Sequence, residues 1–490
     1  MWGSGKFGDF VLEKISQLPT GKRIIKNFFS LTTANLLAQL LSLITVTYLA
    51  RTLGADGFGR IAFAQGIIVY FGIISDFGLR TIGVREVAKN KDEIKRYVSN
   101  ILALRFTLAI TSFILLLVFL VFINKPADYK ILIVIYGLTL FTQVLLLDWA
   151  FEGTEQMEFV GIAQIVRSVI YLPLLLLFVN NSQDLLNVPL IYFVSFLGIV
   201  ILLSYIFVRK YGWFILSLDL KFWKKLMLQA LPLGFSGFLF QVNSSIDIVI
   251  LGFMRSDEEV GWYSAAYKMI LLLIGFGGFL GVAVFPMMSR YYKESIEKLT
   301  KLIYYHFKAM IFFGLPVAVG GIILAPKIIN LFYGGNYRES ILAFQILLGY
   351  LFLAYAMAPF FFLLQASGKM RYFSYTAAVG ALTNIGLNII LIPKYSLIGA
   401  AIATVISNLV IFIMLYVYSS RKIIPVSISR SFMVAAVASL GMGILVYLID
   451  LSLFADILFG FVSYIAIVGI LGGVTIKELK YLIGNRQEID

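Results

Sequence analysis

Long apolar runs recur through this sequence, and they restrict the folds that it can adopt. A helix that crosses the hydrocarbon core of a bilayer needs about 20 mostly apolar residues. Counting on that basis, we find about 14 such runs. The sequence therefore predicts an all-α integral membrane protein. The expected spans are 28–50, 60–78, 98–123, 129–150, 159–180, 187–208, 226–252, 260–286, 303–325, 342–364, 373–392, 397–418, 430–449 and 454–475.

The composition excludes several classes of function. Only 13% of the 490 residues are charged, against roughly 25% in soluble proteins, so no separate soluble domain is expected. The absence of cysteine excludes thiolate chemistry, cysteine-bound metals and disulfides. The single histidine, His306, is expected to be an interfacial residue at a helix start, so neither a Ser-His-Asp site nor a histidine-rich metal site is expected. We predict no catalytic residues, no metal site and no bound cofactor.

The basic residues predict the orientation in the membrane. The net charge of +14 would suggest nucleic acid in a soluble protein, but here the basic residues lie between apolar runs. With the N-terminus in the cytoplasm, about 28 of the 40 Lys and Arg residues fall in inner segments and about 8 in outer ones. The positive-inside rule then favours a multi-pass protein of the cell (inner or plasma) membrane with both termini cytoplasmic. The first apolar run follows Lys26, so no cleavable signal peptide is expected.

The sequence shows a weak internal repeat. Thr52–Ala64 (TLGADGFGRIAFA) resembles Met254–Ala266 (MRSDEEVGWYSAA), which places Gly59 over Gly261, and Phe151–Val166 resembles Leu364–Val379 more loosely. Parallel repeats of this kind are a known transporter plan, with the substrate path between the halves. The expected divisions are an N-terminal six-helix lobe (1–208), a basic cytoplasmic linker (209–225), a C-terminal six-helix lobe (226–420), and two extra helices with a cytoplasmic tail (421–490).

Several of these segments together resemble one family. ARTLGADGFG, DFGLRTIGVRE, SSIDIVILG, EVGWYSAAYK, QASGKM and the stretch Asn384–Ser407 are similar in order and spacing to the polysaccharide flippases. These are Wzx-type O-antigen transporters of the multidrug/oligosaccharidyl-lipid/polysaccharide exporter superfamily. The resemblance implies two pseudo-symmetric six-helix lobes, usually with two more C-terminal helices. It implies a non-enzymatic activity, which is to flip an isoprenoid-pyrophosphate-linked oligosaccharide, such as an O-antigen repeat unit, to the outer leaflet. The implied partners are that lipid, the membrane lipids and other polysaccharide assembly proteins.

Two relatives of this family are alternatives. The lipid II flippases share ARTLGADGFG but typically carry arginines in the first helix, whereas Gln39–Tyr48 has no charge here. Multidrug exporters of small molecules usually have 12 helices, and the last pair argues against them. A membrane glycosyltransferase or polymerase would be expected to carry a long loop with clustered carboxylates, yet Arg209–Lys225 holds one acid, Asp219.

The implied substrate gives the intramembrane cations a role. A pyrophosphate is too polar to cross hydrocarbon unaided, and the planar fork of arginine suits phosphate. Arg80 and Arg85 follow the second helix, while Arg105 and Arg167 each lie about 8 residues into a later one, all counted from the cytoplasmic side. We predict that they bind substrate by contacting the pyrophosphate on the inner side. The alternative is that Arg105 and Arg167 reach back to the lipid headgroups.

Asp247 and Lys268 form a second set, in the seventh and eighth helices. If transport proceeds by alternating access, Lys268 is a candidate phosphate contact on the outer side. Asp247 is a candidate acid for coupling transport to a proton or sodium gradient. A closed ion pair between the two is the alternative. Asp76 is a weaker candidate of the same kind, with pairing to an arginine as its alternative. Pro232 and Gly234 should weaken the seventh helix and form a candidate hinge, or else a static kink.

Overall fold

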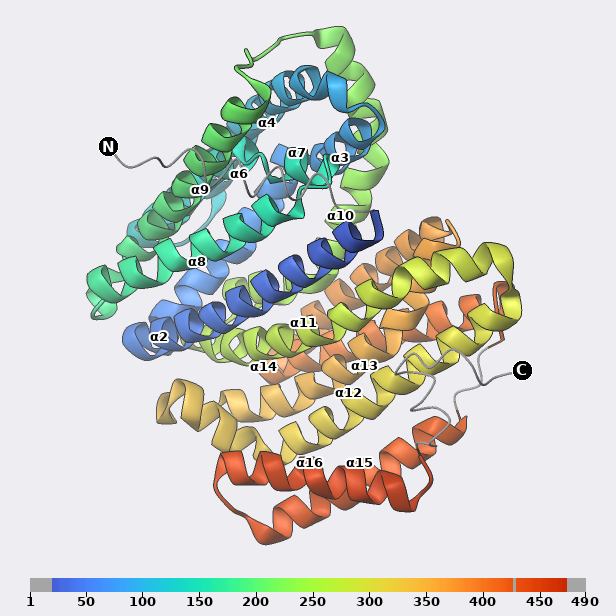
Figure 1. The fold of residues 1–490 in the computed structure, drawn as a ribbon. Helices are drawn as coiled ribbons and strands as arrows, with labels where there is room; N and C mark the ends of the chain where they lie inside the picture. Colours follow the sequence, from blue (N-terminus) through green and yellow to red (C-terminus); the bar gives the residue numbers. More distant parts are fainter. Residues whose placement is uncertain (1–19, 426–428, 474–490) are drawn as a thin grey trace, which may run out of the picture. The chain divides into compact units, whose positions relative to one another are not determined.

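The computed structural model describes residues 20–425 and 429–473, which are helical almost throughout (Figure 1). The all-α prediction is confirmed for this part of the chain. Its elements are α2 (Thr20–Asp76), α3 (Leu79–Lys89), η1 (Lys91–Glu93), α4 (Ile94–Phe122), α5 (Ala127–Gly137), α6 (Thr139–Leu145), α7 (Asp148–Gly153), α8 (Met157–Phe178), η2 (Ser182–Leu186), α9 (Asn187–Tyr211), α10 (Leu220–Met254), α11 (Asp257–Glu294), α12 (Ile296–Tyr333), η3 (Gly335–Tyr337), α13 (Ser340–Ala366), α14 (Met370–Lys422), α15 (Ser429–Ile449) and α16 (Leu453–Ile470).

Twelve segments of the described chain are long and apolar enough to cross a membrane. Two of them, Asn35–Asp76 and Met370–Lys422, are broken inside and hold two predicted spans each, so the twelve account for the fourteen crossings. The span expected at 129–150 is built from three pieces, α5, α6 and α7. The chain is therefore a multi-pass membrane protein. The basic residues expected at the two cytoplasmic termini, before residue 20 and after residue 473, lie outside the described residues.

Both internal breaks occur where the backbone leaves the helical region. Gly54 breaks α2 with φ 70°, which glycine adopts without steric cost. Ser396 breaks α14 with φ 50°, a left-handed conformation that is uncommon for serine. Local contacts hold this second break: Ser396 Oγ donates to Glu259, and Arg255 Nε and Nη2 donate to the carbonyl of Ile392 at 3.2 and 3.1 Å. The freed backbone groups of α14 are thus partly satisfied inside the protein, as a membrane segment requires.

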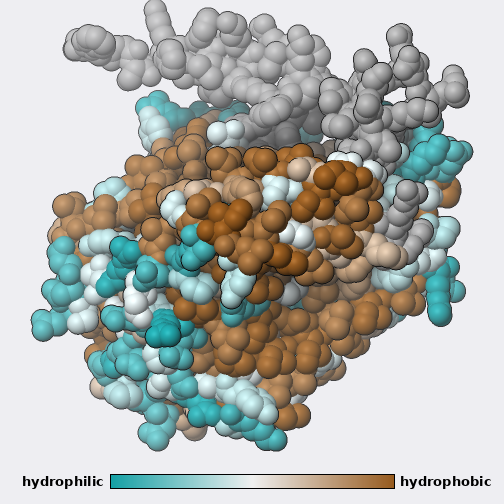
Figure 2. Space-filling model, turned by 90° about the horizontal axis from the view of Figure 1, so that it is seen from below, coloured by the Kyte–Doolittle hydropathy of each residue, from teal (hydrophilic) through white to brown (hydrophobic). Residues whose placement is uncertain are grey.

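Hydrophobic side chains cover much of the exterior. On α16, for example, Leu458 and Phe461 are both mostly exposed. Figure 2 shows one face on which hydrophobic residues cover most of the surface, while hydrophilic residues gather toward the edges. Such a surface is stable against lipid tails and unstable in water, which agrees with the membrane prediction.

The described helices form two compact units. The first contains the chain up to Thr45 together with Ile67–Phe238, and the second contains Val46–Gly66 with the chain from Leu239 onward. Two helices therefore contribute to both units: α2 belongs to the second unit over Val46–Gly66, and α10 belongs to it from Leu239 onward. This grouping by contacts is separate from the predicted division into repeats at 208 and 226, which stays a prediction.

Each unit has its own core. In the first unit, α8 packs on α9, α3 on α7, and α4 on α6, around the fully buried rings of Trp149 and Phe151. In the second unit, α13 packs against α11, α12 and α14, with Phe307 and Phe360 in the core. The extra pair α15–α16 packs on α12 around a smaller cluster that includes Met442.

The two turns matched by the looser sequence repeat have the same conformation. In the first unit, the amide of Gln156 donates to the carbonyl of Phe151 at 2.8 Å, and Glu155 has φ 63°. In the second unit, 213 positions later, the amide of Lys369 donates to the carbonyl of Leu364 at 2.8 Å, and Gly368 has φ 69°. Equivalent residues therefore close equivalent helix ends, which supports the sequence repeat.

Candidate functional site

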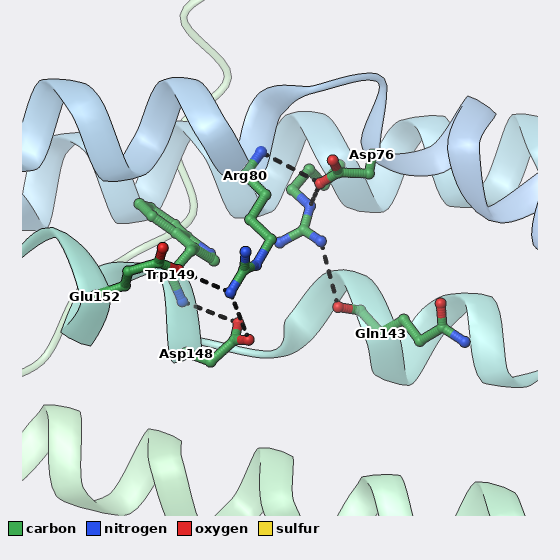
Figure 3. Close-up of polar contacts among 7 residues, drawn as sticks. Asp76, Arg80, Gln143, Asp148, Trp149 and Glu152 are labelled. Carbon is green, nitrogen blue, oxygen red and sulfur yellow. Dashed lines mark hydrogen bonds and ion pairs between the residues drawn. The ribbon is translucent and has the colours of Figure 1, made fainter. Parts of the chain in front are cut away.

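The first unit gathers charged side chains where α2 ends and α3 begins (Figure 3). Asp76 is the last residue of α2, and Gly78, with φ 84°, turns the chain into α3. The Asp76 carboxylate accepts hydrogen bonds from the amides of Gly78 at 3.2 Å and of Arg80 at 3.3 Å. The turn thus fixes both the acid and the arginine that follows it by one helical turn.

Arg80 reaches across to α7. Its Nη2 atom lies 3.0 Å from Asp148 Oδ2 and 2.9 Å from Glu152 Oε2. Burial alone would lower the pKa of Arg80, but the two carboxylates outweigh burial and raise that pKa. The guanidinium is therefore firmly charged.

Arg105 enters the same cluster from α4. Its Nε atom lies 2.9 Å from Asp76 Oδ1, and its Nη2 donates to the carbonyl of Gln143 at 3.4 Å. The residue is only 5% exposed, and its Nη1 has no hydrogen-bond partner within the described part of the chain. The alternative that Arg105 reaches back to the lipid headgroups is therefore wrong, because the guanidinium is held inside the first unit.

The cluster is closely packed and carries an excess of acid. Trp149 is fully buried beneath it, and a Cβ on Gly83 of α3 would lie 2.4 Å from the indole ring, so α3 and α7 approach as only glycine allows. Among these residues, three carboxylates (Asp76, Asp148 and Glu152) face two guanidinium groups. The pairing expected as the alternative for Asp76 is present.

The other two arginines of the predicted group lie elsewhere in the first unit. Arg85 is half-exposed, with its Nε 2.9 Å from Glu86 and its Nη2 donating to Gln229 at 2.9 Å. Arg167 is partly buried, with its guanidinium carbon 5.1 Å from the centre of the Phe196 ring. Of the four arginines, the structure brings together Arg80 and Arg105.

The candidate hinge lies in the middle of a continuous helix. α10 runs through Pro232 without a break and leaves the first unit after Phe238, a few residues beyond it. Gly234 meets the turn of the charged cluster, where an added Cβ would lie 2.7 Å from the carbonyl oxygen of Phe77. A larger residue at 234 would therefore displace the turn that positions Asp76 and Arg80.

Asp247 and Lys268 have separate partners in the second unit. Asp247 is 1% exposed, and its Oδ2 accepts hydrogen bonds from Tyr263 at 2.5 Å and Thr404 at 2.6 Å. Lys268 Nζ donates to Gln65 at 3.4 Å and lies 4.9 Å from the centre of the Phe58 ring. No ion pair joins Asp247 to Lys268 in the described structure, so the alternative of a closed ion pair is wrong.

Sequence reasoning missed a group of buried polar residues in α14, the helix that also supplies Thr404 to Asp247. Asn388 donates to Asn384 Oδ1 at 2.9 Å, and Asn384 donates to Ser407 at 3.2 Å, all three fully buried. Their signal was present in the sequence, since two asparagines four residues apart in an apolar helix share one face. His306 was misplaced too, because it is 3% exposed inside α12 rather than interfacial. No cluster of three or more His, Cys, Asp or Glu occurs within residues 20–425 and 429–473.

Comparisons with known proteins agree with this architecture. Residues 24–292, more than half of the chain, match the family model described as polysaccharide biosynthesis protein, and residues 232–390 match the MatE model. A putative O-antigen transporter of Escherichia coli K12 is 25% identical over 51% of this chain and 61% of its own length. Capsular polysaccharide biosynthesis protein CapF of Staphylococcus aureus is 23% identical over 81% of this chain and all of its own.

Solved structures show the same fold. The lipid II flippase MurJ in an inward closed conformation superposes with a TM-score of 0.74 at 17% identity, covering 91% of this chain and 98% of that one. These relatives are named as transporters, flippases or biosynthesis proteins, in agreement with the prediction of a membrane transporter that is not an enzyme. The fold, the charged membrane helices and the match over residues 24–292 show that the chain belongs to the polysaccharide biosynthesis protein family.

Proposed function

We propose that this protein flips an isoprenoid-pyrophosphate-linked oligosaccharide from the cytoplasmic to the outer leaflet of the cell membrane. The relatives named O-antigen transporter and capsular polysaccharide biosynthesis protein support this class of substrate. The protein would act on its lipid substrate within the bilayer, alongside membrane lipids and other polysaccharide assembly proteins.

The observation that carries this proposal is the buried guanidinium of Arg105 beside that of Arg80. Burying an arginine is costly unless it is paired, and a polar group inside a membrane protein marks a substrate path by default. Arg105 Nη1 remains without a hydrogen-bond partner in the described chain, so the cluster has a donor to spare. Phosphate oxygens accept from such donors in short, charge-assisted hydrogen bonds.

In this proposal, the three carboxylates are the counter-charges that the pyrophosphate displaces. Asp76, Asp148 and Glu152 keep both guanidinium groups compensated while no phosphate is bound. An incoming pyrophosphate competes with them, because it offers the same oxygen geometry with more charge. The side chains of Asp148 and Glu152 are 18% and 32% exposed, so water can solvate their carboxylates when phosphate displaces them from Arg80.

The remaining predicted cations have supporting roles in this proposal. Arg85, half-exposed and bound to Gln229, is a first contact for the headgroup on the cytoplasmic side. Arg167, lying over Phe196, and Lys268, lying over Phe58, carry charge against an aromatic face. A cation held by a ring keeps its remaining hydrogen-bond donors, and this makes both groups suitable for a passing phosphate.

Asp247 is the acid to which we assign coupling to a proton or sodium gradient. Its Oδ1 has no hydrogen-bond partner in the described chain, and neither does Oδ1 of Asn388. Carboxylate, hydroxyl and amide oxygens are the ligands that hard cations prefer, and Thr404 and Tyr263 supply the hydroxyls. An Asp247→Asn variant should therefore lose the dependence of flipping on both gradients. A matched change at the exposed Asp450, Asp450→Asn, should keep it. An unaltered gradient response in Asp247→Asn would remove Asp247 from coupling.

The substrate assignment is tested by reconstitution in proteoliposomes. Movement of a fluorescent isoprenoid-pyrophosphate-linked oligosaccharide is followed by a quencher that reaches only one leaflet. Losing one charge-assisted hydrogen bond costs about 1.5–3 kcal/mol, so Arg80→Ala and Arg105→Ala should slow flipping about 10-fold to 100-fold. Arg96→Ala is the control, since Arg96 is exposed, lies 3.7 Å from Glu93 and is outside the cluster. Flipping at the wild-type rate in both cluster variants would refute the phosphate site.

A second candidate, export of small molecules on the same fold, is favoured by the MatE match over residues 232–390. Lipid II is a further alternative substrate. The same vesicles distinguish the three, because a cationic dye, lipid II and the oligosaccharide lipid can be offered in turn. We expect movement of the oligosaccharide lipid and none of the dye.

A further inference from the structure

The segment 212–225 joins α9 to α10 within the first unit, as a loop over 212–219 followed by the start of α10 (Figure 1). Its large apolar side chains are turned outward: Ile215 is 87% exposed and Trp213 is 83% exposed. We call the whole group the apolar patch, which consists of Trp213, Ile215, Leu216, Leu218 and Leu220, all at least half exposed. Contiguous apolar residues left outside a fold mark a surface that another molecule covers.

The residues between these side chains are fixed to the first unit. The ring of Phe214 packs on the hydrophobic core of this unit, and the amide of Ser217 donates to the carbonyl of Ser99 at 3.5 Å. The carboxylate of Asp219 accepts a hydrogen bond from the amide of Phe222 at 3.0 Å, which caps the start of α10. The loop is therefore held in place with its apolar patch facing away from the core.

Basic side chains adjoin the apolar patch. The first turns of α10 carry three exposed lysines that make no ion pair within the described residues, and we call Lys221, Lys224 and Lys225 the lysine patch. From α4, Lys95 Nζ lies 3.0 Å from the place that a Cβ on Gly212 would take. The single acid of the segment, Asp219, is used by the helix cap. The surface that covers this segment should therefore be apolar and also negatively charged.

The place of the segment in the chain indicates what that surface is. Both helices that it joins belong to candidate membrane spans, Ser182–Tyr211 and Leu220–Met254, so the short loop between them stays near the bilayer. The predicted topology puts it on the cytoplasmic side. At that depth tryptophan prefers the boundary between lipid and water, and lysine reaches the headgroups. A lipid surface accounts for the apolar patch and the lysine patch together.

We propose that the segment 212–225 is an interfacial anchor, whose apolar patch inserts into the cytoplasmic leaflet and whose lysine patch binds anionic phospholipid headgroups. The apolar side chains gain by leaving water, and each lysine near an anionic membrane gains about fivefold in affinity. The proposal goes beyond the transport function and does not depend on the transported substrate. It gives the first unit a binding site for a lipid that is not transported.

The depth of the loop tests the apolar patch. Because the chain has no native cysteine, a nitroxide can be placed at single positions. In nanodiscs that hold one chain and contain phosphatidylglycerol, a nitroxide on Ile215→Cys should be reached by oxygen more readily than by a water-soluble nickel chelate. The matched control is Asp92→Cys in the exposed η1 of the same unit, where the chelate should dominate. Equal access of the chelate to both positions would refute the anchor and leave a protein as the occupant of the patch.

The lipid class tests the lysine patch. A fluorophore on Ile215→Cys is quenched by brominated phosphatidylglycerol, and the mole fraction that gives half-maximal quenching reports the affinity. Lys224→Gln should raise this mole fraction about fivefold. Exchanging all three lysines of the patch for glutamine should make brominated phosphatidylglycerol quench no better than brominated phosphatidylcholine.

The control for this second test has the same change in net charge. It exchanges three exposed lysines of the second unit, Lys293→Gln/Lys298→Gln/Lys301→Gln, and should leave the quenching unchanged. A preference for phosphatidylglycerol that survives loss of the lysine patch would overturn the proposal. Neither readout uses transport, so the anchor stands or fails separately from the flipping of the oligosaccharide lipid.

Discussion

The Asp76–Arg105 pair should be asymmetric in its contribution to stability. Arg105 has 6% of its side chain exposed, whereas Asp76 has 29% exposed and also accepts from the amides of Gly78 and Arg80. Removing the acid leaves a buried guanidinium without its ion partner, whereas removing the base leaves a carboxylate with water and two amides. Asp76→Asn should therefore destabilise the protein more than Arg105→Met does.

The magnitudes follow from this difference in burial. Breaking a buried pair from the side that leaves the buried charge costs about 3 kcal/mol, at the low end of the usual range because the carbonyl of Gln143 still accepts from Arg105. Losing a hydrogen bond to a partly exposed carboxylate costs about 1–2 kcal/mol. The double variant Asp76→Asn/Arg105→Met leaves no uncompensated charge from this pair. It should lie within about 1 kcal/mol of Arg105→Met alone.

Unfolding in mixed detergent micelles measures this cycle, and flipping of the oligosaccharide lipid is measured on the same four proteins. If Arg105→Met proves as destabilising as Asp76→Asn, the burial argument is wrong. The flipping rate then separates structure from transport. The double variant lacks the Arg105 guanidinium but also lacks the Asp76 charge that this guanidinium compensates. Flipping at the wild-type rate in the double variant would therefore show that Arg105 serves only to compensate Asp76.

Two further predictions concern charges outside this pair. Lys327 binds both Asp450, whose side chain is 74% exposed, and Asp456, whose side chain is fully buried. In micelle unfolding, Asp456→Ala should therefore cost about 2–3 kcal/mol and Asp450→Ala at most about 1 kcal/mol. Equal losses of stability in the two variants would contradict this prediction. The hydrogen bond from Lys89 lowers the pKa of Glu86 below its usual 4.5, so its stabilisation is complete above pH 4.5 and is lost as the pH falls through the lowered value. The melting temperature of Glu86→Gln should fall less steeply than that of the wild type over this range.

Apolar length alone predicted the place of the apolar segments found in the described chain. The span at 129–150 is found where it was expected, but the sequence did not show that it is three helices broken near Leu138 and Leu146. Those breaks bring Asp148 to the start of α7, facing Arg80. Hydropathy does not reveal such helix breaks, because the residues on both sides of each break are apolar.

Electrostatic partners were harder to predict than positions. Arg105 was located correctly in the third helix, but its partner Asp76 is 29 residues away on a different helix, and sequence separation gives no measure of that distance. Asp247 and Lys268 are close in sequence and opposite in charge, which favoured an ion pair. Instead, the Asp247 carboxylate accepts hydrogen bonds from Tyr263 and Thr404. Thr404 lies on α14, 157 residues later in the sequence, so sequence proximity could not indicate this partner.

The separation of Asp247 from Lys268 bears directly on the proposed coupling role of Asp247. An acid paired with lysine has its charge already compensated and would gain little from binding a cation, whereas the hydroxyls of Tyr263 and Thr404 supply hydrogen bonds but no counter-charge. Lys268 in turn lies against Gln65 and Phe58, both within the segment Val46–Gly66 of the second unit. Lys268 is therefore not available to neutralise Asp247, as the proposed coupling role of Asp247 requires.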